Sequence, residues 1–375
     1  MNSVEARLDQ IRGAAAPRNH NARTLAALAA NPGCTRRAIM DAAGVDKQRL
    51  AAYAGFPAPF GQSVFALGRG NAFEAQVKAS GCADLLRLLR EHLGLPISEV
   101  SYDNLDEVGG NPGREIRHSR TRALLTRSAR SGEDAGTLFD HPLLRLQVAG
   151  RPVYLEPDLI AFQLRGRFHV VEIKSFSIID GQADGEKVAA AVIQSAVYVL
   201  ALRQLLDEHG FGSERVSDEV VLVCPENFSN NPTAVRIDVR KQLTVLRRQL
   251  SRLERIESLV SAVSPDLTFD LEPDEDGVPR RPPEMVAAAV RSVDARYAPD
   301  CLASCEMCFF CRSEAVGSTA ALGRTTREEL GGIEQVRSVL DLARGLTQAG
   351  QDQAEVQRLL RAAARLRAEV LGEAG

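Results

Sequence analysis

The chain has 375 residues, of which 45% are hydrophobic and 25% charged, so it is long enough for one large domain or two smaller ones around a sizeable core. Its formal net charge is −3, which excludes a globally basic protein and leaves a local basic patch as the surface for nucleic acid. The first residues lack the apolar region of a secretory signal, and no apolar run reaches membrane-spanning length. We therefore expect a cytoplasmic protein that does not enter a membrane.

The N-terminal segment predicts two helical runs with one cysteine between them. Residues 1–30 are polar and then rich in alanine, which is typical of a helix that ends before Asn31-Pro32-Gly33. A second helical run begins at Thr35, and Cys34 precedes it. A lone cysteine is most often a small buried thiol, so Cys34 taken by itself predicts a packing residue.

The stretch from Phe65 to Glu74 leads into a predicted helix that continues to roughly Leu93, because apolar residues recur along one face. Glu74 lies within it. Its carboxylate can complement the positive end of a helix dipole, or it can be an acidic ligand for a metal ion. The sequence alone leaves both interpretations open.

A dense positive segment lies between Gly113 and Arg130 and contains few acidic residues. Its basic residues are Arg114, Arg117, His118, Arg120, Arg122, Arg127 and Arg130. Such a segment can bind DNA phosphates, which supply most sequence-independent affinity, or it can be the solvated face of a helix. On the first interpretation the DNA contacts are Arg114, Arg117, Arg120, Arg122 and Arg127.

The stretch from Val153 to Tyr198 carries the most specific pattern. Leu159–Phe162 and Phe168–Lys174 are rich in β-branched and aromatic residues, which is typical of strands, and Arg165-Gly166-Arg167 between them predicts a hairpin turn. Two more strands are predicted at Glu219–Cys224 and Ala234–Val239. Together these strands could form a central mixed sheet.

Two carboxylates flank this hairpin. Asp158 precedes its first strand and Glu172 lies near the end of the second, so pairing of the strands would bring them together. Two such carboxylates can hold Mg²⁺ or Mn²⁺, which prefer oxygen ligands. Lys174, on the same face as Glu172, can position or activate a metal-bound water beside a scissile phosphate. The pattern therefore predicts metal-dependent phosphodiester hydrolysis.

The residues after the hairpin have helical composition from Glu186 to Glu208. Gln194 and Tyr198 are four residues apart, which makes them neighbours on one helix face. They can contact a phosphate or a base next to the metal.

Four cysteines occur close together near the C-terminal end: Cys301, Cys305, Cys308 and Cys311. In an otherwise ordinary cytoplasmic chain this density indicates a metal or cluster site rather than disulfides. Spacing does not decide between an iron–sulfur cluster and zinc held by four thiolates. Helices predicted at Thr326–Leu346 and Gln351–Leu371 follow, and they more often pack on their own domain or a partner than perform chemistry.

In their order, Asp158, Glu172-Ile173-Lys174 and the pair Gln194 and Tyr198 resemble motif II, motif III and the QxxxY box of the RecB-like branch of PD-(D/E)xK nucleases. The resemblance implies an α/β, restriction-endonuclease-like core, with a central mixed β-sheet flanked by helices and with helical N- and C-terminal additions. It also implies a Mg²⁺- or Mn²⁺-dependent deoxyribonuclease, an exonuclease on single-stranded or end-containing DNA. Its setting would be repair, recombination or defence against mobile DNA, including CRISPR adaptation, with a separate helicase or defence protein as partner.

The resemblance also bears on the remaining candidates. Relatives with a [4Fe–4S] cluster, the CRISPR-adaptation and AddB-type nucleases, have one cysteine near the N-terminus and three near the C-terminus. The implied ligands are Cys34, Cys305, Cys308 and Cys311, with Cys301 as the alternative ligand and Zn²⁺ as the alternative metal. Motif I of the branch carries a histidine that this chain lacks, so Glu74 is the implied acidic ligand there.

The predicted segments are 1–60 with the first cluster cysteine, a nuclease core at 61–265, a linker and cysteine-rich segment at 266–315, and a helical hairpin at 316–375. Two other functions fit the same patterns. One is a DNA-binding subunit of a nuclease–helicase complex that does not cut. The other is a DNA-binding regulator that senses redox state through an iron–sulfur cluster.

Overall fold

The computed structural model describes residues 3–18, 20–31, 33–58, 64–94, 101–105, 113–131, 137–148, 151–164, 166–227, 229–253 and 256–372. Pro32 and Arg165, which belong to the two turns predicted above, lie outside the described residues. The chain forms two compact units. Unit 1 comprises Met1–Pro17, Ala30–Phe60 and Val260–Gly375, and unit 2 comprises Arg18–Ala29 and Gly61–Leu259. The four segments expected from the sequence stay a prediction.

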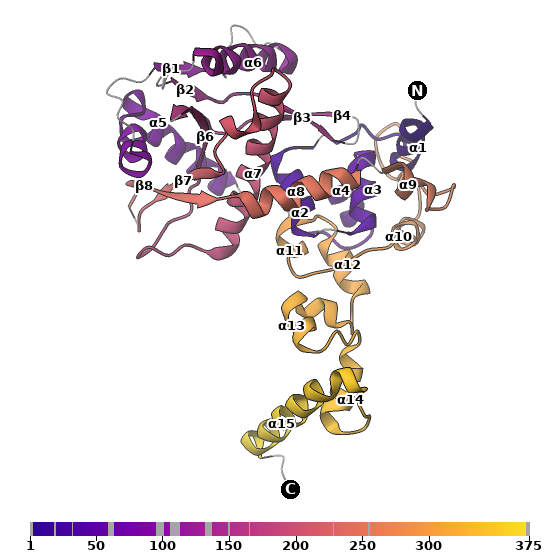
Figure 1. Ribbon diagram of the computed structural model, residues 1–375. Helices are drawn as coiled ribbons and strands as arrows, with labels where there is room; N and C mark the ends of the chain where they lie inside the picture. Colours follow the sequence, from indigo (N-terminus) through magenta and orange to yellow (C-terminus); the bar gives the residue numbers. More distant parts are fainter. Residues whose placement is uncertain are drawn as a thin grey trace. The chain divides into compact units, whose positions relative to one another are not determined.

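Unit 2 is built on a six-stranded mixed sheet with the order β1-β2-β5-β6-β7-β8 (Figure 1). The strands are β1 (Ser101–Asn104), β2 (Thr137–Asp140), β5 (Leu159–Leu164), β6 (Arg167–Ile173), β7 (Glu219–Pro225) and β8 (Pro232–Asp238). The pairs β1/β2 and β6/β7 are parallel and the others antiparallel. The predicted hairpin and the two later strands are confirmed, and the core is of the mixed α/β class. A separate antiparallel ribbon joins β3 (Leu144–Val148) and β4 (Arg151–Leu155).

Helices α5 (Val64–Leu93) and α7 (Gly185–Asp207) cover opposite faces of the sheet of unit 2. The other helices of the unit are α2 (Ala22–Ala30), α6 (Arg114–Ser131), α8 (Arg240–Leu253) and α9 (Ile256–Ser261), with a short 3-10 turn η1 (Ser213–Arg215). On β7, Val221 and Val223 belong to the apolar cluster formed with α5. Leu222 and Cys224 alternate with them and pack with Ala191 of α7 on the opposite face. Cys224 is therefore a core residue, as its place in a strand predicts.

Helix α5 is interrupted at residues 79–82, where the backbone leaves the helical region. Ser80, Gly81 and Cys82 have φ angles of 53°, 66° and 62°. The prediction of one continuous helix through roughly Leu93 is wrong at this point. Glycine has low helix propensity and readily adopts positive φ, so the break falls at the weakest point of the run.

One described helix, Lys187–Asp207 within α7, is long and apolar enough to cross a membrane by length and composition alone. The buried share of its apolar window is 56%, and the core helix of a soluble protein passes the same test. Its packing against the sheet accounts for this apolar composition. The cytoplasmic location stays a prediction.

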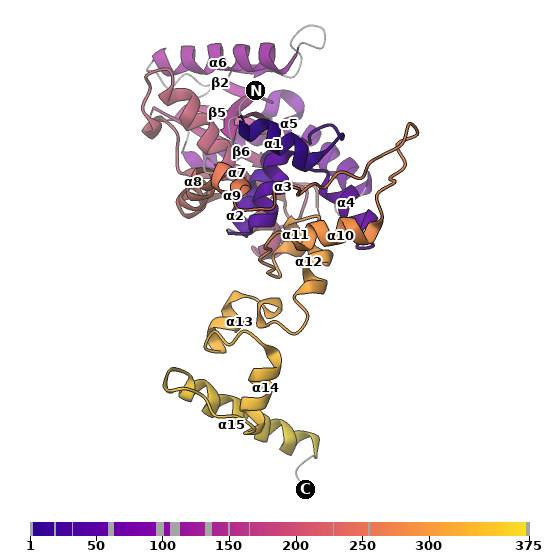
Figure 2. The same cartoon turned by 90° about the vertical axis from the view of Figure 1, so that its right-hand side faces the viewer.

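Unit 1 is helical. Its elements are α1 (Ser3–Arg12), α3 (Thr35–Ala43), α4 (Lys47–Tyr53), α10 (Pro283–Arg291), α11 (Cys301–Ser304), α12 (Cys308–Glu314), η2 (Thr319–Leu322), α13 (Arg324–Glu329), α14 (Val336–Arg344), η3 (Gln351–Gln353) and α15 (Ala354–Leu371). Helix α1 meets residues 264–269 within this unit: the Arg7 guanidinium donates to the carbonyls of Ser264 and Leu267, and the Phe269 amide donates to the Ile11 carbonyl. Helices α14 and α15 lie side by side in both views (Figure 2).

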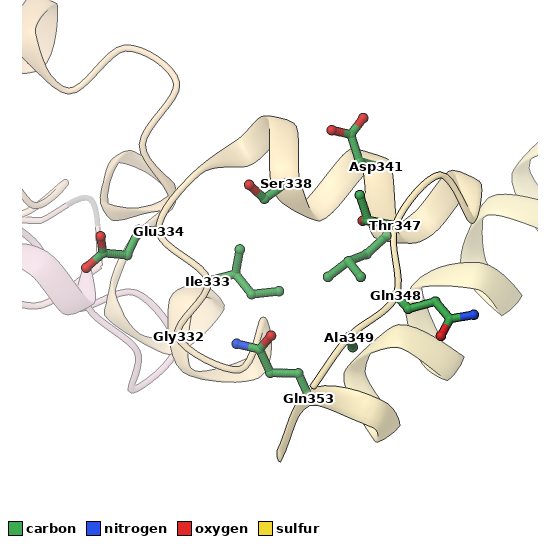
Figure 3. Close-up of a pocket in the computed structure, with 10 residues that line it drawn as sticks. Gly332, Ile333, Glu334, Ser338, Asp341, Thr347, Gln348, Ala349 and Gln353 are labelled. Atoms are coloured by element: carbon green, nitrogen blue, oxygen red, sulfur yellow. The ribbon is translucent and has the colours of Figure 1, made fainter. Parts of the chain in front are cut away.

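The predicted helix Thr326–Leu346 is divided into α13 and α14. Gly331 and Gly332 between them have φ angles of 67° and 72°, which end the first helix. A hollow of about 410 Å³ lies between α14 and the segments around Ile333 and Thr347 (Figure 3). Ile333 points into this hollow, whereas the carboxylates of Glu334 and Asp341 point outward (Figure 3). The hollow therefore borders the small apolar cluster of Ile333, Val339 and Leu342, and most of its other lining residues are polar.

Candidate active site

The hairpin of β5 and β6 brings two of the predicted carboxylates together in unit 2. Leu159 pairs with Val171, so Asp158 lies just before β5 and beside Glu172 near the end of β6. The Ile173 amide donates a hydrogen bond of 2.7 Å to Asp158 Oδ2, which fixes that side chain against the neighbouring strand. The juxtaposition expected from strand pairing is therefore present.

Glu172 points to the sheet face that α7 covers, because it pairs with Leu222 of β7. It is fully buried, with an exposed fraction of 0%. Lys174 lies two residues further on, forms an ion pair with Glu172 and keeps 26% of its side chain exposed. The Lys174 ammonium group thus lies between the buried Glu172 carboxylate and solvent.

Glu74 on α5 belongs to the same group of charges, since its carboxylate raises the pKa of both Asp158 and Glu172 after the larger effect of burial. Helix α5 begins at Val64, so Glu74 is not in the first turn. The helix-dipole interpretation of Glu74 therefore does not hold. The structure brings Glu74, Asp158, Glu172 and Lys174 together in one unit.

Three further residues complete the site and were missed in the sequence. Lys78 Nζ lies 2.5 Å from Glu74 Oε1, 2.5 Å from Asp140 Oδ1, 3.1 Å from His141 Nε2 and 3.3 Å from the Asp158 carbonyl oxygen. His141 Nε2 is also 3.3 Å from Glu74 Oε1. The spacing of Lys78, four residues after Glu74 on a helix, was a usable signal. Asp140 and His141 gave none, because they arrive through the pairing of β2 with β5.

The electrostatics of the site follow from burial and crowding. Burial, and then the charge of Asp158, raises the pKa of Glu172 to about 8. Burial likewise raises the pKa of Asp158. Burial alone would lower the pKa of Lys78, but its hydrogen bonds with Asp140 and Glu74 raise it above the ordinary value.

The carboxylate set fits a divalent cation. Glu172 Oε2 is buried and has no hydrogen-bond partner among the described residues. Such an oxygen, beside a second carboxylate, is a ready ligand for Mg²⁺ or Mn²⁺. Nevertheless, among the described residues no group of three or more His, Cys, Asp or Glu side chains is arranged so that it could hold a metal ion. Lys78 and Lys174 instead neutralise the carboxylates.

Gln194 and Tyr198 lie on one face of α7, as their spacing predicts. Gln194 Nε2 donates to the Tyr198 hydroxyl at 2.9 Å. Tyr198 has an exposed fraction of only 3%, and burial followed by the charge of Glu172 raises its pKa well above the ordinary value. The charge of Glu172 therefore acts on the Tyr198 hydroxyl, and contact of Gln194 and Tyr198 with a substrate strand stays a prediction.

The arginines of α6 also belong to unit 2. Four of the five predicted DNA contacts have exposed side chains: Arg114, Arg120, Arg122 and Arg127. Arg117 differs, because its guanidinium binds Glu156 Oε1 at 2.9 Å and the His141 carbonyl at 3.3 Å. Arg117 thus connects α6 to the loop that carries His141, and the other four are exposed along α6.

The cysteines gather in unit 1. Cys301, Cys305, Cys308 and Cys311 are buried, Cys34 is half-buried, and all five are free thiols. Burial raises the pKa of Cys301 and, to about 12, that of Cys311, and the nearby sulfur of Cys34 adds to both increases. Cys34, distant in sequence, is therefore close enough to the C-terminal cysteines to influence their charge.

Cationic and amide groups surround these sulfurs. Asn31 Nδ2 donates to Cys301 Sγ at 3.0 Å, and Arg36 Nη1 lies 3.2 Å from Cys311 Sγ. Burial raises the pKa of Cys305 to about 11, against the opposing charges of Arg37 and Lys47. Buried positive groups that stabilise thiolates suit a metal or an iron–sulfur cluster, whose protein ligands must be deprotonated.

No protein-family model and no curated protein matches this chain. Among solved structures it is similar to a protein of Eubacterium rectale called “Putative exonuclease”, with 14% sequence identity and a TM-score of 0.31 over 69% of this chain and 84% of that one. It is also similar to SSO0001, with 15% identity and a TM-score of 0.21 over 46% of this chain and 84% of that one. Both TM-scores are low, and we therefore argue function from the site alone.

Proposed function

We propose that the protein is a metal-dependent deoxyribonuclease of the RecB-like branch of PD-(D/E)xK nucleases, with a restriction-endonuclease-like core. The observation that carries the proposal is the convergence of Asp158, Glu172 and Lys174 at the end of one hairpin, with Glu172 Oε2 buried and unpartnered among the described residues. Buried carboxylates with raised pKa values beside a lysine are typical of catalytic centres.

Each residue has a distinct task in this proposal. Asp158 and Glu172 would hold Mg²⁺ or Mn²⁺, with Glu74 as a third carboxylate ligand. When bound, such an ion supplies a Lewis acid for the phosphate and makes the attacking water more acidic. Lys174 would orient that water and offset negative charge on the phosphate, since its ammonium group is partly exposed beside Glu172.

The remaining residues of the site would support these groups. Lys78 holds Glu74 and Asp140 in place through its two ion pairs. Gln194 and Tyr198 would fix the position of the Glu172 carboxylate and approach the strand. The exposed arginines of α6 would contact phosphates of single-stranded or end-containing DNA. Repair, recombination or defence against mobile DNA in the cytoplasm would be the setting, with a separate helicase or adaptation protein as partner.

For unit 1 we propose a [4Fe–4S] cluster held by Cys34, Cys305, Cys308 and Cys311, with Zn²⁺ as the alternative. Three buried thiols and the half-buried Cys34, with Arg36, Arg37 and Lys47 nearby, support it. The cluster would connect the N-terminal and C-terminal segments of the unit. Visible absorbance near 400 nm and a measured iron content above the zinc content, in anaerobically purified protein, are the expected results.

The nuclease proposal is tested by cleavage of labelled single-stranded DNA with Mg²⁺ or Mn²⁺. We expect Asp158→Ala and Lys174→Ala each to reduce the rate by roughly 10³-fold, because each removes a charge that acts on the reacting phosphate. Lys187→Ala is the matched control, since Lys187 is an exposed lysine on α7 paired with Asp184. Pure wild-type protein that binds DNA but shows no metal-dependent cleavage would be a binding subunit, and the proposal would then be wrong.

A further inference from the structure

A second charged site lies in unit 1, next to the cysteines. It is a hollow of about 410 Å³ bordered by α3, the end of α10, residues 293–297, α12 and the segment that follows it. Its basic lining residues are Arg36, Arg291, Arg296 and Arg327, and its acidic ones are Asp294 and Glu314. Nothing in the nuclease proposal uses this hollow, and its excess of arginine over carboxylate requires an explanation.

The carboxylates do not neutralise the arginines. Arg36 binds both oxygens of Glu314, at 2.5 and 3.2 Å, so the acidic residue is already satisfied. Arg291 and Arg296 have exposed side chains, and neither forms an ion pair with a carboxylate in the described ranges. Two guanidinium groups thus remain for a ligand.

The hollow is also preorganised. The guanidinium groups of Arg36 and Arg291 lie 5.5 and 5.3 Å from the centroid of the Phe310 ring. Phe310 is fully buried and is held by an edge contact with Phe56, with ring centroids 5.2 Å apart. An arginine held against an aromatic ring loses less freedom when it binds an anion, so this arrangement favours binding.

We infer that this hollow binds a phosphate group of a nucleic-acid strand. Guanidinium groups bind phosphate through paired, charge-assisted hydrogen bonds, and two unpaired arginines around one hollow match that geometry. The inference rests on the proposed function, because a DNA nuclease supplies the strand. It adds a contact in unit 1 that is distinct from the arginines of α6 in unit 2.

The site borders the cysteine cluster directly. Arg36 lines the hollow and also contacts Cys311 Sγ, and Cys311 itself is a lining residue. A phosphate held by Arg291 and Arg296 would therefore lie in the same hollow as Arg36, which contacts a cysteine that we propose as a ligand. Binding of the strand and occupancy of the cluster site should then be coupled.

The test is the affinity of the full chain for a fluorescein-labelled single-stranded oligonucleotide, measured by anisotropy in EDTA so that cleavage does not occur. We expect the double variant Arg291→Ala/Arg296→Ala to bind roughly tenfold more weakly, since each lost charge-assisted bond contributes on the order of 1 kcal/mol or more. The slope of log affinity against log salt should fall by about 0.7 for each phosphate contact removed. Arg291→Lys/Arg296→Lys, which keeps the charge, should recover part of the affinity.

The matched control is Arg337→Ala/Arg365→Ala, which removes two exposed arginines of the same unit outside the hollow. An equal loss in both double variants would mean that only net charge matters, and it would overturn the inference. Unchanged affinity in Arg291→Ala/Arg296→Ala, with an unchanged melting temperature, would overturn it as well.

Competition by inorganic phosphate as effective as that by the oligonucleotide would show a site for the free ion, not for a strand. Wild-type protein that cuts DNA while the variant binds normally would leave the proposed function intact, whereas wild type that neither binds nor cuts would refute that function.

Discussion

The carboxylate site of unit 2 and the cysteine cluster of unit 1 both bring ionisable side chains close together, but different secondary-structure elements hold them. Each brings together side chains that can ionise to anions, from distant parts of the sequence, and places cations beside them. These cations are Lys78 and Lys174 among the carboxylates, and Arg36, Arg37 and Lys47 among the sulfurs. Three of the five lysines in the chain thus lie at one of these two sites.

The secondary-structure elements that hold the two sites differ in rigidity. Asp158 and Glu172 are fixed by the register of β5 and β6 within a six-stranded sheet. The cysteines lie on α11 and α12, which have 4 and 7 residues, and on the residues around them. Helices this short are not stable by themselves. We therefore expect the carboxylate site to exist without its metal and the cysteine cluster to depend on what it binds.

Loss of the cluster should give the largest effect. Cys308→Ala should lower the stability of unit 1 by more than about 5 kcal/mol, because structural metal sites contribute on the order of 10 kcal/mol to folding. Hydrogen exchange measured by mass spectrometry would report the two units separately. Cys224→Ala, the same change in the core of unit 2, should cost roughly 1 kcal/mol. Similar losses in both variants would remove the distinction between the two sites.

Glu172→Gln tests the carboxylate site, and here we expect a gain in stability instead of a loss. The substitution should abolish cleavage, yet it should stabilise unit 2 at high pH in the absence of metal. The pKa of Glu172 is raised to about 8, so the folded protein keeps a proton that the unfolded chain releases above its ordinary pKa of 4.5. Stability therefore falls as pH rises from 4.5 to about 8, and the Gln variant escapes that loss.

Urea denaturation in EDTA at pH 6 and pH 9 measures this effect. The wild type should lose stability between the two values, the variant should lose less, and Mn²⁺ should restore the wild type alone. Asp158 contributes in the same direction, because burial raises its pKa too. A wild type equally stable at both pH values would show that the carboxylates are not crowded as described.

We expect His169 of β6 to have a smaller effect on the free energy of unfolding, and only at acidic pH. Burial lowers its pKa to about 4 from 6.5, so the imidazole is neutral in the folded protein. The unfolded chain binds the extra proton first, and stability is lost as pH falls from about 6.5 to 4. The loss amounts to about 3 kcal/mol, at roughly 1.4 kcal/mol per pH unit. In His169→Leu the difference in unfolding free energy between pH 7 and pH 4 should shrink by that amount; an unchanged difference would mean that His169 titrates normally.

The contrast between the two sites also explains what could be predicted from sequence. The hairpin and the pairing of Asp158 with Glu172 are local, because strand periodicity and one turn determine them. Asp140 and His141 could not be found, since they reach Lys78 only through the pairing of β2 with β5. The breaks at Gly81 and Gly331 differ from these, because they are local: glycine has low helix propensity and readily adopts positive φ, which a periodic apolar pattern does not reveal.

The smallest effect concerns the fifth cysteine. If Cys34, Cys305, Cys308 and Cys311 are the ligands, Cys301→Ala should keep the iron content of wild type. Its Sγ then serves mainly as acceptor for Asn31 Nδ2, and loss of that hydrogen bond costs about 1 kcal/mol. Asn31→Ala should cost more, because Asn31 Nδ2 also donates to the Arg296 carbonyl, and the double variant should cost little more than Asn31→Ala alone, since that change already removes the bond to Cys301. Iron analysis and urea denaturation of the three variants measure these effects, and loss of iron in Cys301→Ala would make Cys301 a ligand in place of Cys34 or of one of the other three.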